Sequence, residues 1–172
     1  MNKHSIVHIY TGKGKGKTTA ALGLALRASG AGLKVYIAQF IQGRPYSEIK
    51  ALKKFRNIKI EQFGRGCFIT ARPAVKDVLL AKAGLNKVRD IITGRKYNLI
   101  ILDEMNVAVK FGLLSLKEVI GVLQKAPKSL EVVLTGRYAH PRLIKMADLV
   151  SEIRDVKHYY RKGVKARKGI EF

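Results

Sequence analysis

The 172-residue sequence predicts a single three-layer α/β domain, in which a mainly parallel central sheet is covered by helices on both faces. Two observations indicate this fold class. Short apolar, β-branched runs alternate with longer helix-forming segments along most of the chain. A glycine-rich turn also joins the first apolar run to the first helical segment. Because no repeat or linker interrupts this pattern, we expect one domain over residues 1–172, with the basic tail 154–172 included.

The predicted elements follow one another in a regular order. Strands are expected at residues 6–10, 33–40, 58–63, 99–102, 132–134 and 149–153. Helices are expected at residues 18–29, 47–54, 73–93, 115–126 and 141–147. Local signals set the helix limits: glycines follow the first helix, Pro73 opens the third, and Ser115 with Glu118 forms a capping box.

The glycine-rich turn has the residue types of a phosphate-binding loop. Glycines let successive backbone N–H groups face an anion, and the helix N-terminus behind them adds further donors. Lys17 would reach the outer phosphates, and the Thr18 hydroxyl would join a Mg²⁺ shell. Thr11 stands where the usual motif has its first glycine, and the alternative is a flexible glycine–lysine turn. The predicted ATP-binding residues of the loop are Gly12, Lys13, Gly14, Lys15, Gly16, Lys17, Thr18 and Thr19.

Two acidic residues, Asp103 and Glu104, close a wholly apolar predicted strand. Parallel strands end at one edge of a sheet, so these carboxylates would lie beside Thr18 and hold Mg²⁺, or Mn²⁺, directly or through water. The alternative is a pair of surface acids. Arg27 and Arg137 are further candidates for phosphate binding, although any one arginine is weak support in a chain with 34 Lys and Arg residues.

The composition is that of a soluble globular protein with an unusual charge. The formal net charge is +22, with a pI near 10.3, and the basic residues are dispersed along the chain. A solvated basic surface is favoured over dedicated nucleic-acid binding, because no arginine-rich arm or aromatic ribonucleoprotein pattern is present. No apolar run is long enough for a membrane helix, no signal peptide is seen, and Cys67 is the only cysteine. We expect a cytoplasmic protein without an internal disulfide.

Beyond these motifs, the sequence resembles the P-loop ATP:corrinoid adenosyltransferases. The likeness is carried by residues 10–21, 23–28, 39–40, 102–106, 133–137, 147–152, 156–158 and 163–172. In this family a threonine before the loop glycine is usual, so Thr11 supports the resemblance. The resemblance implies a P-loop NTPase-like fold. It also implies that the Co(I) of a reduced corrinoid, such as cob(I)alamin, attacks the 5′ carbon of ATP and expels triphosphate.

The resemblance also implies roles for particular residues. Lys17, Thr18 and Glu104 would be catalytic, by stabilising the triphosphate and its metal ion. Members often carry a tryptophan-containing segment beside the corrinoid, and this chain has no tryptophan. Phe68 and Ile69 occupy the matching stretch and would supply an apolar wall. The family is typically homodimeric, and the basic surface suggests an acidic electron donor such as a flavodoxin.

Two other function classes stay open at this point. A nucleic-acid-stimulated P-loop ATPase would suit the charge and the loop, although no clear water-positioning residue is seen. A nucleotide-binding regulator without catalysis is the third possibility. Phosphate release stimulated by DNA would favour the ATPase, and ATP binding without turnover under strong reduction would favour the regulator.

Overall fold

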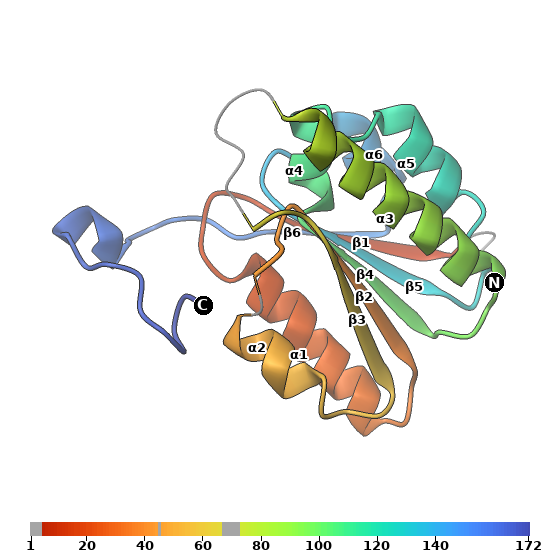
Figure 1. Ribbon diagram of the computed structural model, residues 1–172, viewed down its shortest axis with the longest axis horizontal. Coiled ribbons are helices and arrows are strands. Elements are labelled where there is room, and N and C mark those ends of the chain that lie inside the picture. The colour runs from red at the N-terminus through yellow and green to blue at the C-terminus, as the bar shows by residue number, and fades with distance from the viewer. Residues whose placement is uncertain (1–4, 45, 67–72) are drawn as a thin grey trace.

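The structure is a computed structural model that describes residues 5–44, 46–66 and 73–172. Within these residues a six-stranded, wholly parallel sheet has the strand order β3-β2-β4-β5-β1-β6 (Figure 1). The strands are β1 (Ile6–Thr11), β2 (Val35–Phe40), β3 (Ile58–Phe63), β4 (Leu99–Asp103), β5 (Glu131–Thr135) and β6 (Leu149–Glu152). This arrangement confirms the predicted fold class.

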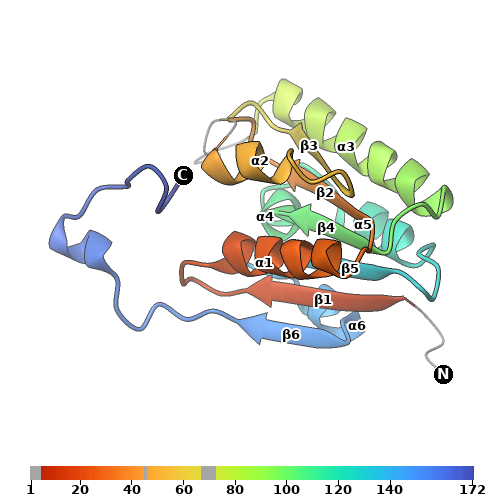
Figure 2. The same cartoon turned by 90° about the horizontal axis from the view of Figure 1, so that it is seen from below.

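Helices cover both faces of the sheet, as Figures 1 and 2 show. One face carries α1 (Lys17–Gly30) and α2 (Ser47–Leu52). The other face carries α3 (Val75–Thr93), α4 (Met105–Lys110), α5 (Leu116–Leu123) and α6 (Pro141–Met146). A one-turn 3-10 helix, Tyr159–Lys162, lies in the C-terminal segment. None of the helices in the described part of the chain is long and apolar enough to cross a membrane.

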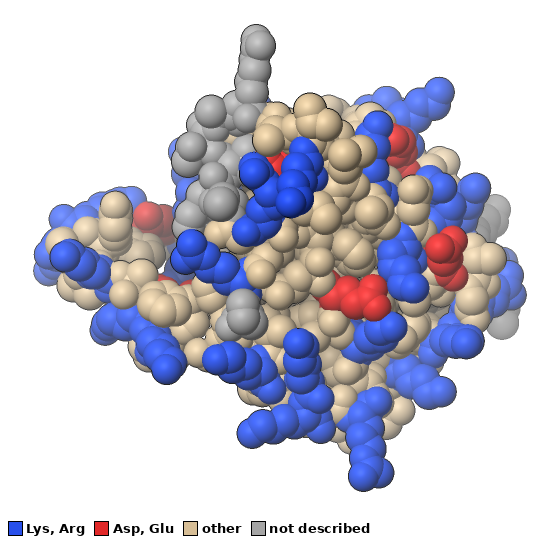
Figure 3. Space-filling view, in the orientation of Figure 1, with Lys and Arg blue, Asp and Glu red and all other residues tan. Residues whose placement is uncertain are grey.

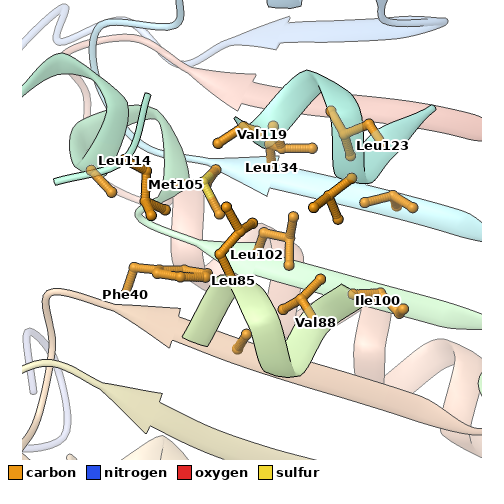
Figure 4. Packing of buried hydrophobic residues seen from close by; sticks show 14 of the residues in the cluster. Phe40, Leu85, Val88, Ile100, Leu102, Met105, Leu114, Val119, Leu123 and Leu134 are labelled. Atoms are coloured by element: carbon orange, nitrogen blue, oxygen red, sulfur yellow. The ribbon is translucent and has the colours of Figure 1, made fainter. Parts of the chain in front are cut away.

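The core has two layers because the central strands are buried on both faces. In β4, Ile100 and Leu102 face the layer of α3 and α5, whereas Leu99 and Ile101 face α1. Figure 4 shows the first of these layers, with Leu102 between the side chains of α3 and α5. Burial on both faces explains why this strand is apolar throughout instead of alternating.

The predicted elements agree with the observed ones to within a few residues, with two omissions. The prediction missed α4, which begins directly behind β4, and the 3-10 helix of the tail. No proline or glycine separates β4 from α4, and Glu104 makes the turn with φ 59°. The sequence before α4 therefore lacks the boundary signals by which a short helix is recognised.

Candidate active site

The glycine-rich loop lies at the carboxyl edge of the sheet, between β1 and α1, the edge at which open parallel sheets bind ligands. Gly16 has φ 115° and stands immediately before α1, where its carbonyl accepts the N–H of Ala20 at 2.8 Å. Because residues with a Cβ avoid this left-handed conformation, glycine is required here. The chain therefore enters α1 directly from the loop, with the helix N-terminus at the edge of the sheet.

The chain after β6 packs directly against this loop. The N–H of Gly14 donates to the carbonyl of Ile153 at 2.7 Å, and the N–H of Ile153 donates to the carbonyl of Thr11 at 2.8 Å. A Cβ on Gly14 would lie 2.6 Å from the carbonyl oxygen of Arg154, closer than real contacts allow. Glycine at position 14 thus serves the packing of two chain segments as well as the shape of the loop.

Lys17 is folded into the loop, with 8% of its surface exposed. Its Nζ donates to the carbonyl of Gly14 at 2.6 Å. Burial lowers the pKa of Lys17 from its ordinary value, and the charge of Arg137 lowers it further, while Glu104 and Asp103 act in the opposite direction. A buried ammonium group beside loop N–H groups is a suitable partner for phosphate oxygens.

Asp103 is the centre of a buried hydrogen-bond network. It has no exposed surface, and its carboxylate accepts from three side chains. Thr18 Oγ1 and Thr135 Oγ1 donate to Oδ1 at 2.9 and 2.6 Å, and Gln39 Nε2 donates to Oδ2 at 3.1 Å. Burial raises the pKa of Asp103, and the three donors oppose that shift. The carboxylate is therefore held in one orientation beside the first turn of α1.

Glu104 lies next to this network in a strained position. Its φ of 59° is unusual for a residue with a side chain, and its N–H donates to Thr135 Oγ1 at 3.0 Å. Burial, followed by the charge of Asp103, raises the pKa of Glu104 to about 7. Gly136 has φ 122°, and a Cβ there would lie 3.1 Å from Glu104 Oε2. The glycine leaves room for the carboxyl group at the edge of the sheet.

Two hollows lie beside the loop, and Lys13 and Glu152 line both of them. One, of about 240 Å³, is lined by the loop and the start of the segment after β5, including Arg137 and Tyr138. The other, of about 310 Å³, is lined by Lys13 and the chain after β6, including Arg154 and Arg161. Acidic side chains line them as well: Glu152 borders both hollows and pairs with Arg154, and Asp155 borders the larger one and pairs with Arg161.

The structure brings most of the predicted site residues together and leaves Arg27 apart. Residues 12–19 form the loop and the first turn of α1, with Asp103, Glu104 and Arg137 beside them. Arg27 lies in the last turn of α1, ten residues or about 15 Å along the helix from Lys17. Its predicted role in ATP binding stays a prediction. Phe68 and Ile69 lie outside the described residues, as does Cys67.

Two further residues of the network, Gln39 and Thr135, were absent from the predicted site. Both are fully buried and polar, and both stand at or near the carboxyl end of an apolar strand. A buried polar residue at that position is the signal that could have identified them, since it needs a partner at the ligand-binding edge.

Together, the parallel sheet, the glycine-rich loop and the Thr18–Asp103 contact define a P-loop NTPase-like protein. A sequence model of the family described as ATP:corrinoid adenosyltransferase BtuR/CobO/CobP matches residues 3–172. The chain belongs to this family, which confirms the resemblance seen in the sequence.

Named relatives agree with this assignment. The chain is 34% identical to the corrinoid adenosyltransferase of Pseudomonas aeruginosa, over 99% of this chain and 85% of the relative. It is 33% identical to the corrinoid adenosyltransferase of Escherichia coli strain K12, over 100% of this chain and 88% of the relative. The corrinoid adenosyltransferase CobA of Salmonella typhimurium is 34% identical over the same shares of the two chains.

Proposed function

We propose that the protein transfers the 5′-deoxyadenosyl group of ATP to the Co(I) of a reduced corrinoid, in adenosylcobalamin synthesis or salvage. The electron pair of Co(I) forms a bond to the 5′ carbon, the carbon–oxygen bond breaks, and its electron pair leaves with triphosphate. The observation that carries the proposal is the phosphate loop with its buried Lys17, in a chain that belongs to this family.

The loop then has the task of stabilising a leaving group. Negative charge accumulates on the whole triphosphate as the carbon–oxygen bond breaks, and donors fixed in advance stabilise that charge without reorganising. Lys17 supplies a buried ammonium group, and the N-terminus of α1 supplies N–H donors and the positive end of its dipole. Co(I) already holds the attacking electron pair, so the reaction removes no proton and needs no general base.

The residues around Thr18 fit a magnesium or manganese ion. The Thr18 hydroxyl and the Asp103 carboxylate are 2.9 Å apart, both offer hard oxygen ligands, and Glu104 lies beside them. Among the described residues no group of three or more His, Cys, Asp or Glu side chains could hold a metal by itself, so phosphate oxygens and water would complete the shell. The ion would neutralise charge on the triphosphate. Glu104 would orient water in that shell.

The corrinoid would lie beyond the loop, facing the 5′ carbon of ATP. We assign Phe68 and Ile69 to its apolar wall on the strength of the sequence resemblance, because tryptophan is absent from the chain. Substituting both residues with serine should raise the KM for corrinoid and leave the KM for ATP unchanged. An equal change in both constants would contradict the assignment.

The proposal includes an acidic, flavodoxin-like electron donor, a homodimer and a cytoplasmic location. Figure 3 shows Lys and Arg side chains spread over the displayed face, with few acidic groups between them. Such a surface attracts an acidic donor through long-range forces that salt screens. Activity supported by a flavodoxin should therefore fall with ionic strength, and an unchanged rate would refute this partner. Sedimentation equilibrium tests the dimer.

The decisive experiment is an anaerobic assay. Purified protein, Mg²⁺-ATP and chemically reduced cob(I)alamin should give the light-sensitive alkyl-cobalt product, followed by visible absorbance, together with triphosphate. Lys17→Ala should lower the rate by at least about 100-fold, because it removes a buried charge from the leaving group, whereas the exposed Lys117→Ala should not. Orthophosphate release that rises with added DNA, without alkyl-cobalt product, would instead support a nucleic-acid-stimulated ATPase.

A further inference from the structure

We propose that Tyr159 and Glu171 are positioning residues for the reaction, which hold the phosphate loop in place by fixing the side chain of Lys15. Together the three residues form what we call the C-terminal anchor. The inference rests on the proposed function, since it assumes that the loop binds the triphosphate of ATP. It assigns a task to the C-terminal residues, which lie far from the loop in the sequence.

The C-terminal segment, residues 153–172, passes next to the phosphate loop and contacts it. Figures 1 and 2 show that the chain leaves the sheet after β6, makes the 3-10 helix Tyr159–Lys162, and turns back toward α2. At its end, Ser47 Oγ donates to the carbonyl of Phe172 at 3.3 Å, and the Phe172 ring lies 6.0 Å from that of Tyr46. The segment therefore spans from the edge strand to α2 and passes the loop between them.

The ammonium group of Lys15 makes three hydrogen bonds to this segment. Its Nζ donates to Tyr159 OH, to the carbonyl of Ile170 and to Glu171 Oε1, each at 2.9 Å. A lysine has three N–H donors, and all three have partners here. The side chain of Lys15 thus has no free donor for a phosphate oxygen. Any part that Lys15 takes in ATP binding falls to its backbone.

Glu171 is held from several sides. Besides Lys15, it accepts from Tyr159 OH and from the backbone N–H of Arg167, the latter at 2.6 Å. The guanidinium of Arg167 lies 5.0 Å from the centre of the Tyr159 ring. The hydrogen bonds from Tyr159 and Lys15 hold the pKa of Glu171 well below its usual range. Glu171 is therefore a fixed carboxylate whose charge is neutralised before a triphosphate arrives.

A second contact fixes the other end of the loop. The Ile153 backbone bonds to Thr11 and Gly14, and the anchor holds Lys15, so residues 11–15 are joined to the segment at both ends. The carbonyl of Gly14 is also the partner of the Lys17 ammonium group. Movement of the loop at Lys15 would be passed on to Gly14 and Lys17. The anchor thus acts on the leaving group through the residues that contact it.

Three variants test the proposal: Glu171→Gln, Tyr159→Phe and Lys15→Met. Each should lower kcat/KM for ATP by about 10-fold, because the donors around the triphosphate lose their alignment. Lys15→Arg, which keeps the charge, should recover part of the loss. The double variant Lys15→Met/Glu171→Gln should be no worse than the single variants, because the anchor acts as one unit.

The chain offers a matched control in Tyr36, Glu61 and Lys59. There Tyr36 OH donates to Glu61 Oε2 at 2.7 Å, and Lys59 pairs with Glu61 Oε1 at 2.8 Å. This cluster has the chemistry of the anchor but lies on β2 and β3, and β3 is four strand spacings, roughly 19 Å, from β1. Glu61→Gln should leave kcat/KM for ATP unchanged.

Two results would overturn the proposal. The first is a kcat/KM for ATP within twofold of the wild-type value in all three variants. The second is a loss that is the same for ATP and for corrinoid and that follows the fall in melting temperature, as expected for a purely structural role. ATP binding measured by calorimetry without corrinoid tests the anchor separately. Weaker ATP binding by Glu171→Gln supports the anchor even if the wild-type protein transfers no adenosyl group.

Discussion

Replacing Thr135 with valine should destabilise the protein strongly, although the side chain is small and does not contact the predicted triphosphate site directly. Thr135 has no exposed surface, and its hydroxyl makes two contacts at once. It donates to Asp103 Oδ1 at 2.6 Å and accepts the N–H of Glu104 at 3.0 Å. Valine has nearly the same shape, so the substitution removes both hydrogen bonds without leaving a large cavity.

The magnitude follows from these two bonds. A hydrogen bond to a charged group contributes about 1.5–3 kcal/mol, and a buried N–H left without a partner costs about 1–3 kcal/mol. We therefore expect the free energy of unfolding to fall by about 3–5 kcal/mol at pH 7. For a chain of this length, that corresponds to a melting temperature lower by roughly 10 °C.

The effect should also depend on pH. Burial raises the pKa of Asp103 in the folded protein, so ionising this group reduces stability as pH rises through the folded pKa. The hydrogen bond from Thr135 lowers the pKa of Asp103, so its removal makes the ionised form of Asp103 more costly in the folded protein. Below the ordinary aspartate pKa of about 3.9, the carboxyl is protonated in both states and the cost disappears. The difference between the variant and the wild type should therefore shrink as pH falls.

Urea unfolding at pH 7 and at pH 5, followed by circular dichroism, measures both quantities. Thr93→Val is the matched control, because the Thr93 hydroxyl donates only to the exposed carbonyl of Arg89 at 2.9 Å. It should change the free energy of unfolding by no more than about 0.5 kcal/mol. The reasoning fails if Thr135→Val is within about 1 kcal/mol of the wild type at pH 7, below the smallest contribution expected from the lost bonds. A difference that grows on acidification would refute the charge argument.

Three further substitutions test one ion pair and the packing of two glycines. Asp77→Asn should lower the free energy of unfolding by about 1 kcal/mol at pH 7, because it removes the charge of a carboxylate that pairs with Arg65. Arg65 donates to the Asp77 carboxylate at 2.6 and 2.7 Å, and these bonds hold the pKa of Asp77 below its ordinary value. The stabilisation is therefore present above the ordinary aspartate pKa and is lost as pH falls through the lower pKa of the folded protein. Urea unfolding that shows equal destabilisation by Asp77→Asn at pH 3 and at pH 7 would contradict this. Gly14→Ala should cost about 1–3 kcal/mol, because the new Cβ would lie 2.6 Å from the Arg154 carbonyl oxygen. Gly23→Ala, where nothing lies within 4 Å of the new Cβ, should stabilise by about 0.5–1 kcal/mol, and thermal unfolding compares the two glycine variants directly.

Much of the fold could be predicted because its signals are local. Apolar runs and helix-forming segments alternate with capping residues between them, and these patterns gave the fold class and the strand limits to within about two residues. The phosphate loop was found for the same reason, since its glycines, Lys17 and Thr18 are consecutive in the chain. What is contiguous in sequence can be recognised without the structure.

The rest of the site depends on contacts that only folding creates. Gln39 and Thr135 are single polar residues at the ends of apolar strands, and nothing in their local sequence says that both bond to Asp103. Glu171 is 156 positions from Lys15 in the chain, and one acidic residue in a basic tail predicts no partner. Their roles come from three-dimensional packing, which has no local pattern.

Strand register is what turns these separate residues into one site. Gln39 of β2 stands opposite Asp103 of β4, and Tyr10 of β1 stands opposite Thr135 of β5. Side chains alternate between faces of a sheet, so a slip of one residue would send Asp103 to the wrong face and away from Thr18. Such a slip would place the Asp103 carboxylate in the apolar layer under α3 and α5, away from its three donors Thr18, Thr135 and Gln39, and burying a charge without partners is costly. The hydrogen bonds of Asp103 therefore favour the observed register of β4, and substitutions that disturb the strand pairing should affect the predicted metal site before they unfold the protein.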